Sequence, residues 1–314
     1  MSEIDSGRRG GYALGSMKIV DYQGVNILGI YIERLRVLSF AWEIRAASHD
    51  SPFIVMPLPP IRYHSFARPL PYASTWFLQE RIHNLQLQLR RQSAHPDLLL
   101  LLQHRPTYTA GRRQTQPSIQ DDRLRLLNLG ADFVSATRGG QLTYHGPGQI
   151  VGYPLIDLSR YSPVMGARDY VCRIQTFLQS HLKDSHDILH MPSEHTGIFL
   201  DPITKIGSIG VQVRHRLTSH GFALNVTREP LPWFNQIVAC GLADVQAGSI
   251  ESKLQKYLSV QDEIPALVRQ FGHVFQRDMV KMVLQDEGEI GEALMALENE
   301  AEKAGRWSEK PRLI

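Results

Sequence analysis

The sequence is poor in cysteine: its 314 residues include two, Cys172 and Cys240, which form no CxxC pair. This excludes a disulfide framework and a zinc-knuckle pattern, and it fits a reducing compartment. An excess of one charge is also missing, because 34 basic residues are balanced by 31 acidic residues to leave a net charge of +3. The charge therefore gives no reason to expect a nucleic-acid partner.

Long apolar runs are absent as well. No stretch reaches 18 consecutive apolar residues, so no membrane span is predicted. The chain contains neither a GxxxxGK(S/T) phosphate loop nor a GxSxG nucleophile elbow. The remaining composition, 43% hydrophobic and 21% charged, is that of an ordinary globular protein with enough apolar residues for a sizeable core.

The first 60 residues differ from the rest of the chain. Residues 1–50 show no clear period, and positions 51–60 hold four prolines. The segment lacks the apolar core of a secretory signal. We predict that residues 1–60 are an irregular extension and a possible leader. A targeting helix would use residues 34–48, which are basic and apolar. Met1, Met17 and Met56 all remain candidates for the true start.

From residue 61 the pattern becomes that of a folded domain, which we predict to extend to residue 276. Apolar residues at helical spacing and short apolar or alternating runs follow one another without a regular βαβ order. Helices are expected over 72–91, 118–129, 170–182 and 262–275, strands over 97–102, 132–137, 149–155, 197–200, 209–213 and 222–226, and turns at 201–202 and 217–220. This mixture favours an α+β fold, a mixed sheet flanked by helices. Residues 277–314 are expected to form a charged helical tail and a solvated appendage.

The most informative segment runs from Arg138 to Gln149. Five of its twelve residues are Gly or Pro, and most of the others carry hydrogen-bonding side chains. Glycines between strands let a ligand approach the backbone closely, because no Cβ stands in the way. A structural hairpin would need only one or two glycines, so we interpret the segment as a binding site. His145 within it is a candidate acid, base or orienting group.

Two further residues are candidates for chemistry. Cys240 precedes a glycine that frees nearby backbone amides, although a cysteine in an apolar segment is more often a packing residue. Lys205 precedes a run of small residues and isoleucines, an unusual setting for a solvated lysine. An ammonium group beside a thiol favours the thiolate. The alternative for Lys205, an ordinary exposed turn lysine, stays open.

Other candidates are weaker. Cys172 shares a helical segment with Tyr170, Ile174 and Phe177 and is expected to pack in the core. His186, His190 and His195 suggest a metal at first sight. No carboxylate or cysteine completes that set at ligand spacing, so no metal site is predicted.

Four segments, in order, resemble the lipoyl(octanoyl) transferase family over residues 62–275. The family pattern Arg-Gly-Gly-x-x-Thr-aromatic-His-x-x-Gly-Gln is matched by Arg138 through Gln149, and the family's lysine stretch is similar to Lys205 through Gly210. The family's His-Gly-Leu-Ala-Leu-Asn-Val strand resembles His220 through Val226. The usual Asn-Pro-Cys-Gly is met by Val238-Ala239-Cys240-Gly241, which departs from the pattern in its first two residues.

The resemblance implies a fold similar to biotin and lipoate ligases and an acyltransferase without a cofactor. Cys240 would be the nucleophile and Lys205 its partner. The substrate-binding residues implied are Arg138, Gly139, Gly140, Gln141, Leu142, Thr143, Tyr144, His145, Ser208, Ile209, Gly210, Gly221, Phe222 and Ala223. An octanoyl group would pass from acyl carrier protein to a lysine of a lipoyl domain, as in the glycine cleavage H protein and the E2 subunits of 2-oxoacid dehydrogenases.

Two other functions remain open at this point. An ATP-dependent lipoate or biotin ligase would share the fold and a similarly placed lysine but would need no cysteine nucleophile. A non-catalytic protein that binds acyl carrier protein or lipoyl domains would fit the departure at Ala239. The resemblance implies a mitochondrial location for this chain, with the cytoplasm as the alternative.

Overall fold

In the computed structural model, which describes residues 58–92, 94–114, 116–238, 241 and 244–312, the buried strand β2 (Asp97–Leu102) lies inside the main sheet. Its leucines alternate between two apolar clusters. Leu99 and Leu101 belong to one, and Leu98, Leu100 and Leu102 belong to the other. Because successive side chains of a strand point to opposite faces, the run of five leucines supplies both faces of the sheet at once.

The main sheet has eight strands in the order β10-β8-β9-β6-β2-β1-β11, and β7 pairs with β8 off this path. The strand bounds are β1 Ile61–Ser65, β6 Gln149–Leu155, β7 Ile198–Asp201, β8 Thr204–Arg214, β9 Leu217–Asn225, β10 Gln246–Ala247 and β11 Met279–Lys281. β1 runs parallel to both of its neighbours and β8 parallel to β10, whereas β9 pairs antiparallel with both β6 and β8. The sheet is therefore mixed, which confirms the predicted α+β architecture.

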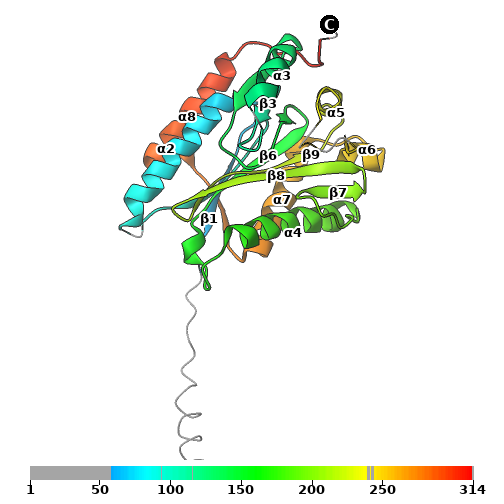
Figure 1. The fold of residues 1–314 in the computed structure, drawn as a ribbon. Helices are drawn as coiled ribbons and strands as arrows, with labels where there is room; N and C mark the ends of the chain where they lie inside the picture. Colours follow the sequence, from blue (N-terminus) through cyan, green and yellow to red (C-terminus); the bar gives the residue numbers. More distant parts are fainter. Residues whose placement is uncertain (1–57, 93, 115, 239–240, 242–243, 313–314) are drawn as a thin grey trace, which may run out of the picture. The chain divides into compact units, whose positions relative to one another are not determined.

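Helices cover both faces of this sheet (Figure 1). The helices α4 (Ala167–His186) and α7 (Val260–Phe275) supply eleven of the 26 buried residues in the cluster on the face of Leu99 and Leu101. The helices α2 (Tyr72–Arg90) and α8 (Gly288–Lys303) lie side by side on the opposite face. Short helical segments complete the connections: α6 Ile250–Leu254, η1 Leu158–Arg160 and η3 Leu284–Asp286.

A second sheet carries the glycine-rich segment. It has three strands in the order β4-β3-β5, with bounds β3 Thr107–Ala110, β4 Asp132–Ser135 and β5 Thr143–His145. The helices α3 (Gln116–Asn128) and α5 (Leu231–Phe234) close a third apolar cluster against it. There the Tyr144 ring stacks on Trp233 with centroids 5.4 Å apart. This cluster anchors the far side of the glycine-rich loop.

Most predicted elements are confirmed within a few residues, but the turn expected at 217–220 is wrong. Those residues begin β9, and the turn lies at His215 and Arg216, which both have positive φ. Turns with positive φ usually contain glycine or asparagine. Because this turn consists of His215 and Arg216, no glycine or proline marks it in the sequence. Cys172 is also exposed rather than buried. It lies two positions from Tyr170, about 200° around the helix from the core-facing side.

The C-terminal segment is helical, as expected, but it is not a solvated appendage. Leu294 and Leu297 of α8 are buried with Leu78 and Ile82 of α2. Its charged residues lie on the outer side of the helix, which is why a heavily charged sequence still contributes to the core. The prediction for residues 1–60 falls almost wholly outside the described residues, and the predicted domain boundaries stay a prediction.

In the part of the chain that the structure describes, none of the helices combines the length and apolar character needed to cross a membrane.

We expect truncation of the α8 core to destabilise the whole protein. The side chain of Leu294 is fully buried, and Leu294→Ala should lower the free energy of unfolding by about 2–5 kcal/mol, because a cavity remains. Urea denaturation measures this, with Leu124→Ala on the exposed surface of α3 as the matched control. Equal, small losses for both variants would mean that α8 contributes little to the core.

Candidate active site

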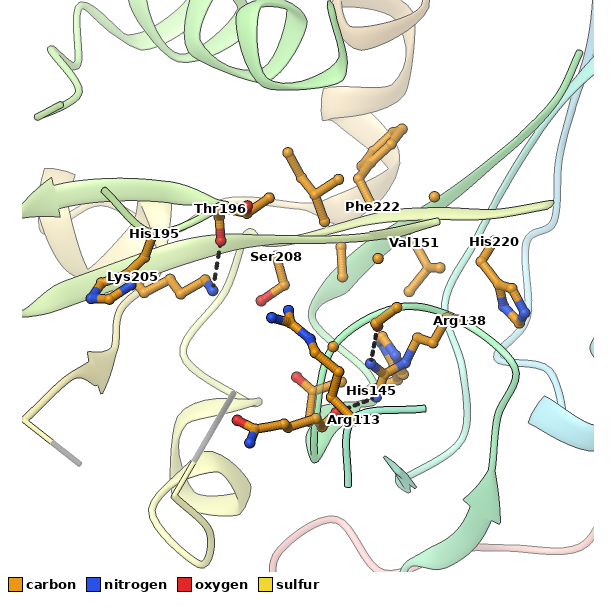
Figure 2. A pocket seen from close by; sticks show the side chains of 18 of the residues that line it. Arg113, Arg138, His145, Val151, His195, Thr196, Lys205, Ser208, His220 and Phe222 are labelled. Atoms are coloured by element: carbon orange, nitrogen blue, oxygen red, sulfur yellow. Dashed lines mark hydrogen bonds between the residues drawn. The ribbon is translucent and has the colours of Figure 1, made fainter. Parts of the chain in front are cut away.

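A cavity of about 380 Å³ opens between the glycine-rich loop and the strands β6, β8 and β9. Figure 2 shows Lys205, Thr196 and His195 at one end of it and Arg138, His145 and His220 toward the other. The size lies within the usual range of ligand pockets. Thirteen predicted site residues line it: Arg138, Gly139, Gly140, Gln141, Thr143, His145, Lys205, Ser208, Ile209, Gly210, Gly221, Phe222 and Ala223.

Two predicted substrate-binding residues, Leu142 and Tyr144, do not line this cavity. Both are buried in the third apolar cluster with Trp233 and Phe234. Alternation along β5 explains the difference, because a strand that turns Thr143 and His145 toward the cavity turns its other residues away. A sequence motif is a run of consecutive residues, whereas only every second side chain of a strand can reach a ligand on one face.

Two other predicted residues contribute backbone rather than side chain. Ile209 and Phe222 are paired across β8 and β9, and both side chains pack in the cluster beside α4 and α7. Figure 2 shows Phe222 on the opposite side of its strand from Ser208. The apolar wall of the cavity comes instead from Val151 and Ala223, which are paired across β6 and β9.

Lys205 reaches the cavity because β8 is irregular. Lys205 and Ser208 are three residues apart and would face opposite sides of a regular strand. Phe199 pairs with Lys205 and Ile198 with Gly207, so β8 has one extra residue at this point. A bulge of this kind re-aims a side chain. It turns the Lys205 side chain to the same side as Ser208, whereas Ile206 packs in the core.

The Lys205 ammonium group is held in a narrow place. Its side chain is largely buried, its Nζ donates a hydrogen bond to the Thr196 carbonyl oxygen at 3.1 Å, and it lies 5.4 Å from the centre of the Phe199 ring. Gly197 makes room for it. A Cβ at that position would lie 2.5 Å from Lys205 Cε, and the backbone there has φ +139°. Only glycine meets both conditions.

The predicted nucleophile, Cys240, lies outside the described residues. Its neighbour Gly241 is described and lines the same cavity as Lys205. Gly241 has φ +70°, and Gln141 Oε1 occupies the place of its missing Cβ, 1.9 Å from that position. The glycine after Cys240 is therefore required by its backbone conformation and by the contact with the glycine-rich loop.

Arg138 braces the glycine-rich loop from within. Its guanidinium group donates to the Thr109 carbonyl oxygen at 2.6 Å and to the Gln141 carbonyl oxygen at 2.9 Å. It also donates to the Thr109 hydroxyl and to the Gly139 carbonyl oxygen. Such a dense set of charge-assisted bonds compensates the burial of the charge. Arg138 lines the cavity, but most of its donors bind the protein's own backbone.

The protonation of His145 follows from a chain of hydrogen bonds. Asn225 Nδ2 donates to the Gly248 carbonyl oxygen, which orients Asn225 Oδ1 toward Gln149 Nε2 at 2.8 Å. Gln149 Oε1 then accepts from His145 Nδ1 at 2.8 Å. The network assigns the proton to Nδ1 and leaves Nε2 as the acceptor. Burial, with the neighbouring His104 and the Arg138 charge, holds the pKa of His145 well below its usual value, so the ring is neutral.

A second buried histidine supports the same wall. His104 Nδ1 donates to the Leu70 carbonyl oxygen, and its Nε2 accepts from the Tyr153 hydroxyl at 2.6 Å. Burial lowers the pKa of His104 to about 4. Burial and the positive charges of Arg138 and Arg214 likewise lower the pKa of His220 to about 3. His104, His145 and His220 are thus neutral at pH 7.

Sequence reasoning missed several residues of the cavity. Nine further residues line it, of which only His220 and Gly241 lie in the four segments that carry the family resemblance: Tyr72, Arg113, Val151, Tyr153, Glu194, His195, Thr196, His220 and Gly241. The alternation of Val151 and Tyr153 around Gly152 was the one signal for a wall of β6. His195 was considered only as a metal ligand with His186 and His190, yet the structure places it beside Lys205.

Comparison with known proteins identifies the family of this chain. The family model described as the lipoyl protein ligase A/B catalytic domain matches residues 71–272. The chain belongs to this family. An octanoyltransferase of Koribacter versatilis is 36% identical over 207 residues, which are 64% of the chain and 80% of that protein. The octanoyltransferase assignment is therefore confirmed, and the chain is an acyltransferase.

Two further comparisons complete the picture. A mitochondrial octanoyl-[acyl-carrier-protein]:protein N-octanoyltransferase of Danio rerio is 34% identical over 205 residues, which are 65% of the chain and 88% of that protein. A solved bi-partite lipoate protein ligase from Thermoplasma acidophilum superposes with a TM-score of 0.50 at 13% identity, covering 77% of this chain and 91% of that one. The second match shows the shared fold, as predicted, and says nothing about the reaction.

The pH dependence of stability should report the neutral His104. An unfolded histidine has a pKa near 6.5, so the unfolded state binds the proton first as the pH falls. The contribution of His104 to stability is complete above about pH 6.5 and is lost toward pH 4, which amounts to about 3 kcal/mol. In urea denaturation, His104→Asn should lower stability at pH 7 and flatten this dependence. An unchanged slope in the variant would contradict the assignment.

Proposed function

We propose that the chain transfers an octanoyl group from an acyl carrier protein thioester to a lysine of a lipoyl domain, through a thioester on Cys240. One observation carries the proposal: Lys205 and Gly241, the residue after Cys240, line the same cavity. That cavity also offers an apolar wall of Val151 and Ala223. A base, a neighbour of the nucleophile and an acyl-binding surface thus meet in one place.

In the first step the Cys240 thiolate attacks the thioester carbonyl carbon, and the bond to the phosphopantetheine sulfur breaks. The leaving thiolate takes a proton from the Lys205 ammonium group. An ammonium group beside a cysteine favours the thiolate that the step needs. One thioester replaces another, so the step is near neutral in free energy and needs no ATP. The covalent intermediate divides one difficult transfer into two easier steps.

In the second step the neutral amine of the acceptor lysine attacks the same carbonyl carbon. The bond to the Cys240 sulfur breaks, and the amine proton passes to Lys205, which acts as a base in this step. An amide replaces a thioester, so the step runs downhill. The narrow seat of Lys205 beside Thr196 and Gly197 supports a proton carrier held in one position.

Both steps develop negative charge on the carbonyl oxygen. The Val211 carbonyl accepts from the Gly139 N–H at 3.2 Å, so this edge of β8 lies against the glycine-rich loop. Along a strand, the backbone groups of every second residue point to the same edge. The Ile209 N–H, two residues before Val211, therefore points to the loop as well. We assign the Ile209 amide as a donor to that oxygen. This role suits a residue that lines the cavity only with its backbone.

The apolar wall would accept the acyl chain. Burial at about 0.8 kcal/mol per CH₂ contributes about 5 kcal/mol for an octanoyl group. Arg113 and Lys205 are cations of the lining, and Glu194 is an exposed anion of it. The acceptor would be a lipoyl-domain protein such as the glycine cleavage H protein or a 2-oxoacid dehydrogenase E2 subunit. The location stays a prediction, because one relative is mitochondrial and another is bacterial.

The acyl-enzyme is directly testable. Incubation with octanoyl acyl carrier protein, without ATP, should add one octanoyl group to the chain, removable by hydroxylamine, because a thioester forms on Cys240. Intact-protein mass spectrometry measures the adduct. Cys240→Ala should abolish it, and Cys172→Ala, which replaces an exposed cysteine on α4, should retain it.

Two results would overturn the proposal. An adduct retained in Cys240→Ala and lost in Cys172→Ala would move the nucleophile elsewhere. Transfer to a lipoyl domain only with free octanoate and ATP would instead assign the chain to the ligase reaction, whose fold it shares. Binding of a lipoyl domain with transfer under neither condition would favour a non-catalytic protein.

The seat of Lys205 gives a second test. Gly197→Ala adds a Cβ 2.5 Å from Lys205 Cε and should displace the ammonium group. The transfer rate should fall by about 100-fold or more, as for loss of an acid–base group, and Lys205→Met sets the scale. Gly305→Ala, where a Cβ meets nothing within 4 Å, is the control. A wild-type transfer rate in folded Gly197→Ala would show that catalysis does not depend on this position of Lys205.

A further inference from the structure

Two histidines of α4 and one glutamate of α7 converge on a single point. His181 Nε2 lies 3.1 Å and His186 Nε2 lies 2.8 Å from the same oxygen, Glu263 Oε2. One ligand atom from each of the three residues lies within 4.8 Å of the other two. None of the three lines the active-site cavity. The cluster is therefore a separate feature of the fold.

Sequence spacing did not reveal this cluster. His181 and His186 are five residues apart on α4, which separates them by about 140° around the helix axis. Glu263 comes from the first turn of α7, 77 residues after His186. The packing of α4 and α7 on one sheet face supplies the carboxylate that His186 lacks in its own segment. His190 and His195 take no part in the cluster.

The donor set is that of a metal site. Two imidazole nitrogens and one carboxylate oxygen bind Zn²⁺ in sites where water fills the fourth position. With bonds of about 2.1 Å in tetrahedral geometry, ligand atoms lie about 3.4 Å apart. The contacts of 2.8 and 3.1 Å to Glu263 Oε2 would widen by about 0.3–0.6 Å to reach this spacing. The two imidazole nitrogens lie within 4.8 Å of each other, so an ion would need only small side-chain shifts.

Burial and access fit the same interpretation. The side chain of His181 is fully buried, whereas those of Glu263 and His186 keep 7% and 9% of their surface exposed. That exposed side offers an entry path and a place for the fourth ligand. A ligating His181 would carry its proton on Nδ1, and Ser185 Oγ lies 3.4 Å away as an acceptor. A divalent ion would also compensate the buried carboxylate.

We propose that His181, His186 and Glu263 bind one Zn²⁺ ion that joins the C-terminal end of α4 to the first turn of α7. The fourth ligand would be water on the side of His186. The role is structural, because the ion would link two helices of one core cluster and lies outside the cavity. The site does not depend on the acyl-transfer proposal, and its test uses no activity measurement.

The experiment is a Zn²⁺ titration of the metal-free full chain against a chromophoric chelator, in a Cys240→Ser background that removes a competing thiolate. We expect one equivalent of bound Zn²⁺ and a Tm raised by about 5 °C at a hundred-fold excess of free Zn²⁺ over Kd. Glu263→Gln should weaken binding by about 100-fold or more, because even second-shell changes cost 10–100-fold. His273→Asn, an exposed histidine on the same helix, should leave binding unchanged.

A second measurement keeps the test independent of whether Glu263→Gln folds. X-ray absorption of the Zn²⁺-loaded protein should show two imidazole ligands and oxygen donors at about 2.0–2.2 Å. Absence of stoichiometric binding would overturn the proposal. So would a shell without two imidazoles, or binding that survives in folded Glu263→Gln and is lost in His273→Asn.

Discussion

The buried guanidinium group of Arg138 is the interaction on which the site depends most. Its donors bind the carbonyl oxygens of Thr109, Gly139 and Gln141, so a loop with few side chains of its own is held against β3. Burial is the main cause that lowers the pKa of His145 and of His220, and the Arg138 charge lowers both further. Arg138 therefore shapes the glycine-rich wall and helps to keep these two histidines neutral.

The two faces of the main sheet divide the work of the protein. The face beside α4 and α7 is filled by apolar side chains, including Phe222 and Ile209. The opposite face opens as the cavity between β6, β8 and β9, where small residues such as Ala223 leave space. The bulge in β8 joins these two roles, because it turns Lys205 toward the cavity while Ile206 stays in the core.

Much of the fold and of the site could be predicted from the sequence, for physical reasons that particular residues show. The five consecutive leucines of β2 and the helical spacing of apolar residues in α4 predict that these side chains are buried, as they are. Gly140 has φ +92°, and a Cβ at Gly207 would lie 2.8 Å from Ile198 Cγ1, so glycines in both motifs are required by backbone conformation or close packing. Leu142 and Tyr144 were misplaced because a motif carries no information on which strand face it presents. Cys172 is exposed because a residue two positions from Tyr170 faces away from the core side of α4.

The family, the order of the elements and the segments that meet at the site could all be inferred from the sequence, since local periodicity and glycine positions are properties of neighbouring residues. What lies on each side of those segments depends on tertiary packing. This packing made α8 part of the core and brought His195 beside Lys205. It also placed Glu263 between two histidines of another helix. Such contacts join residues far apart in the chain, and their partners are chosen by packing, which no local pattern records.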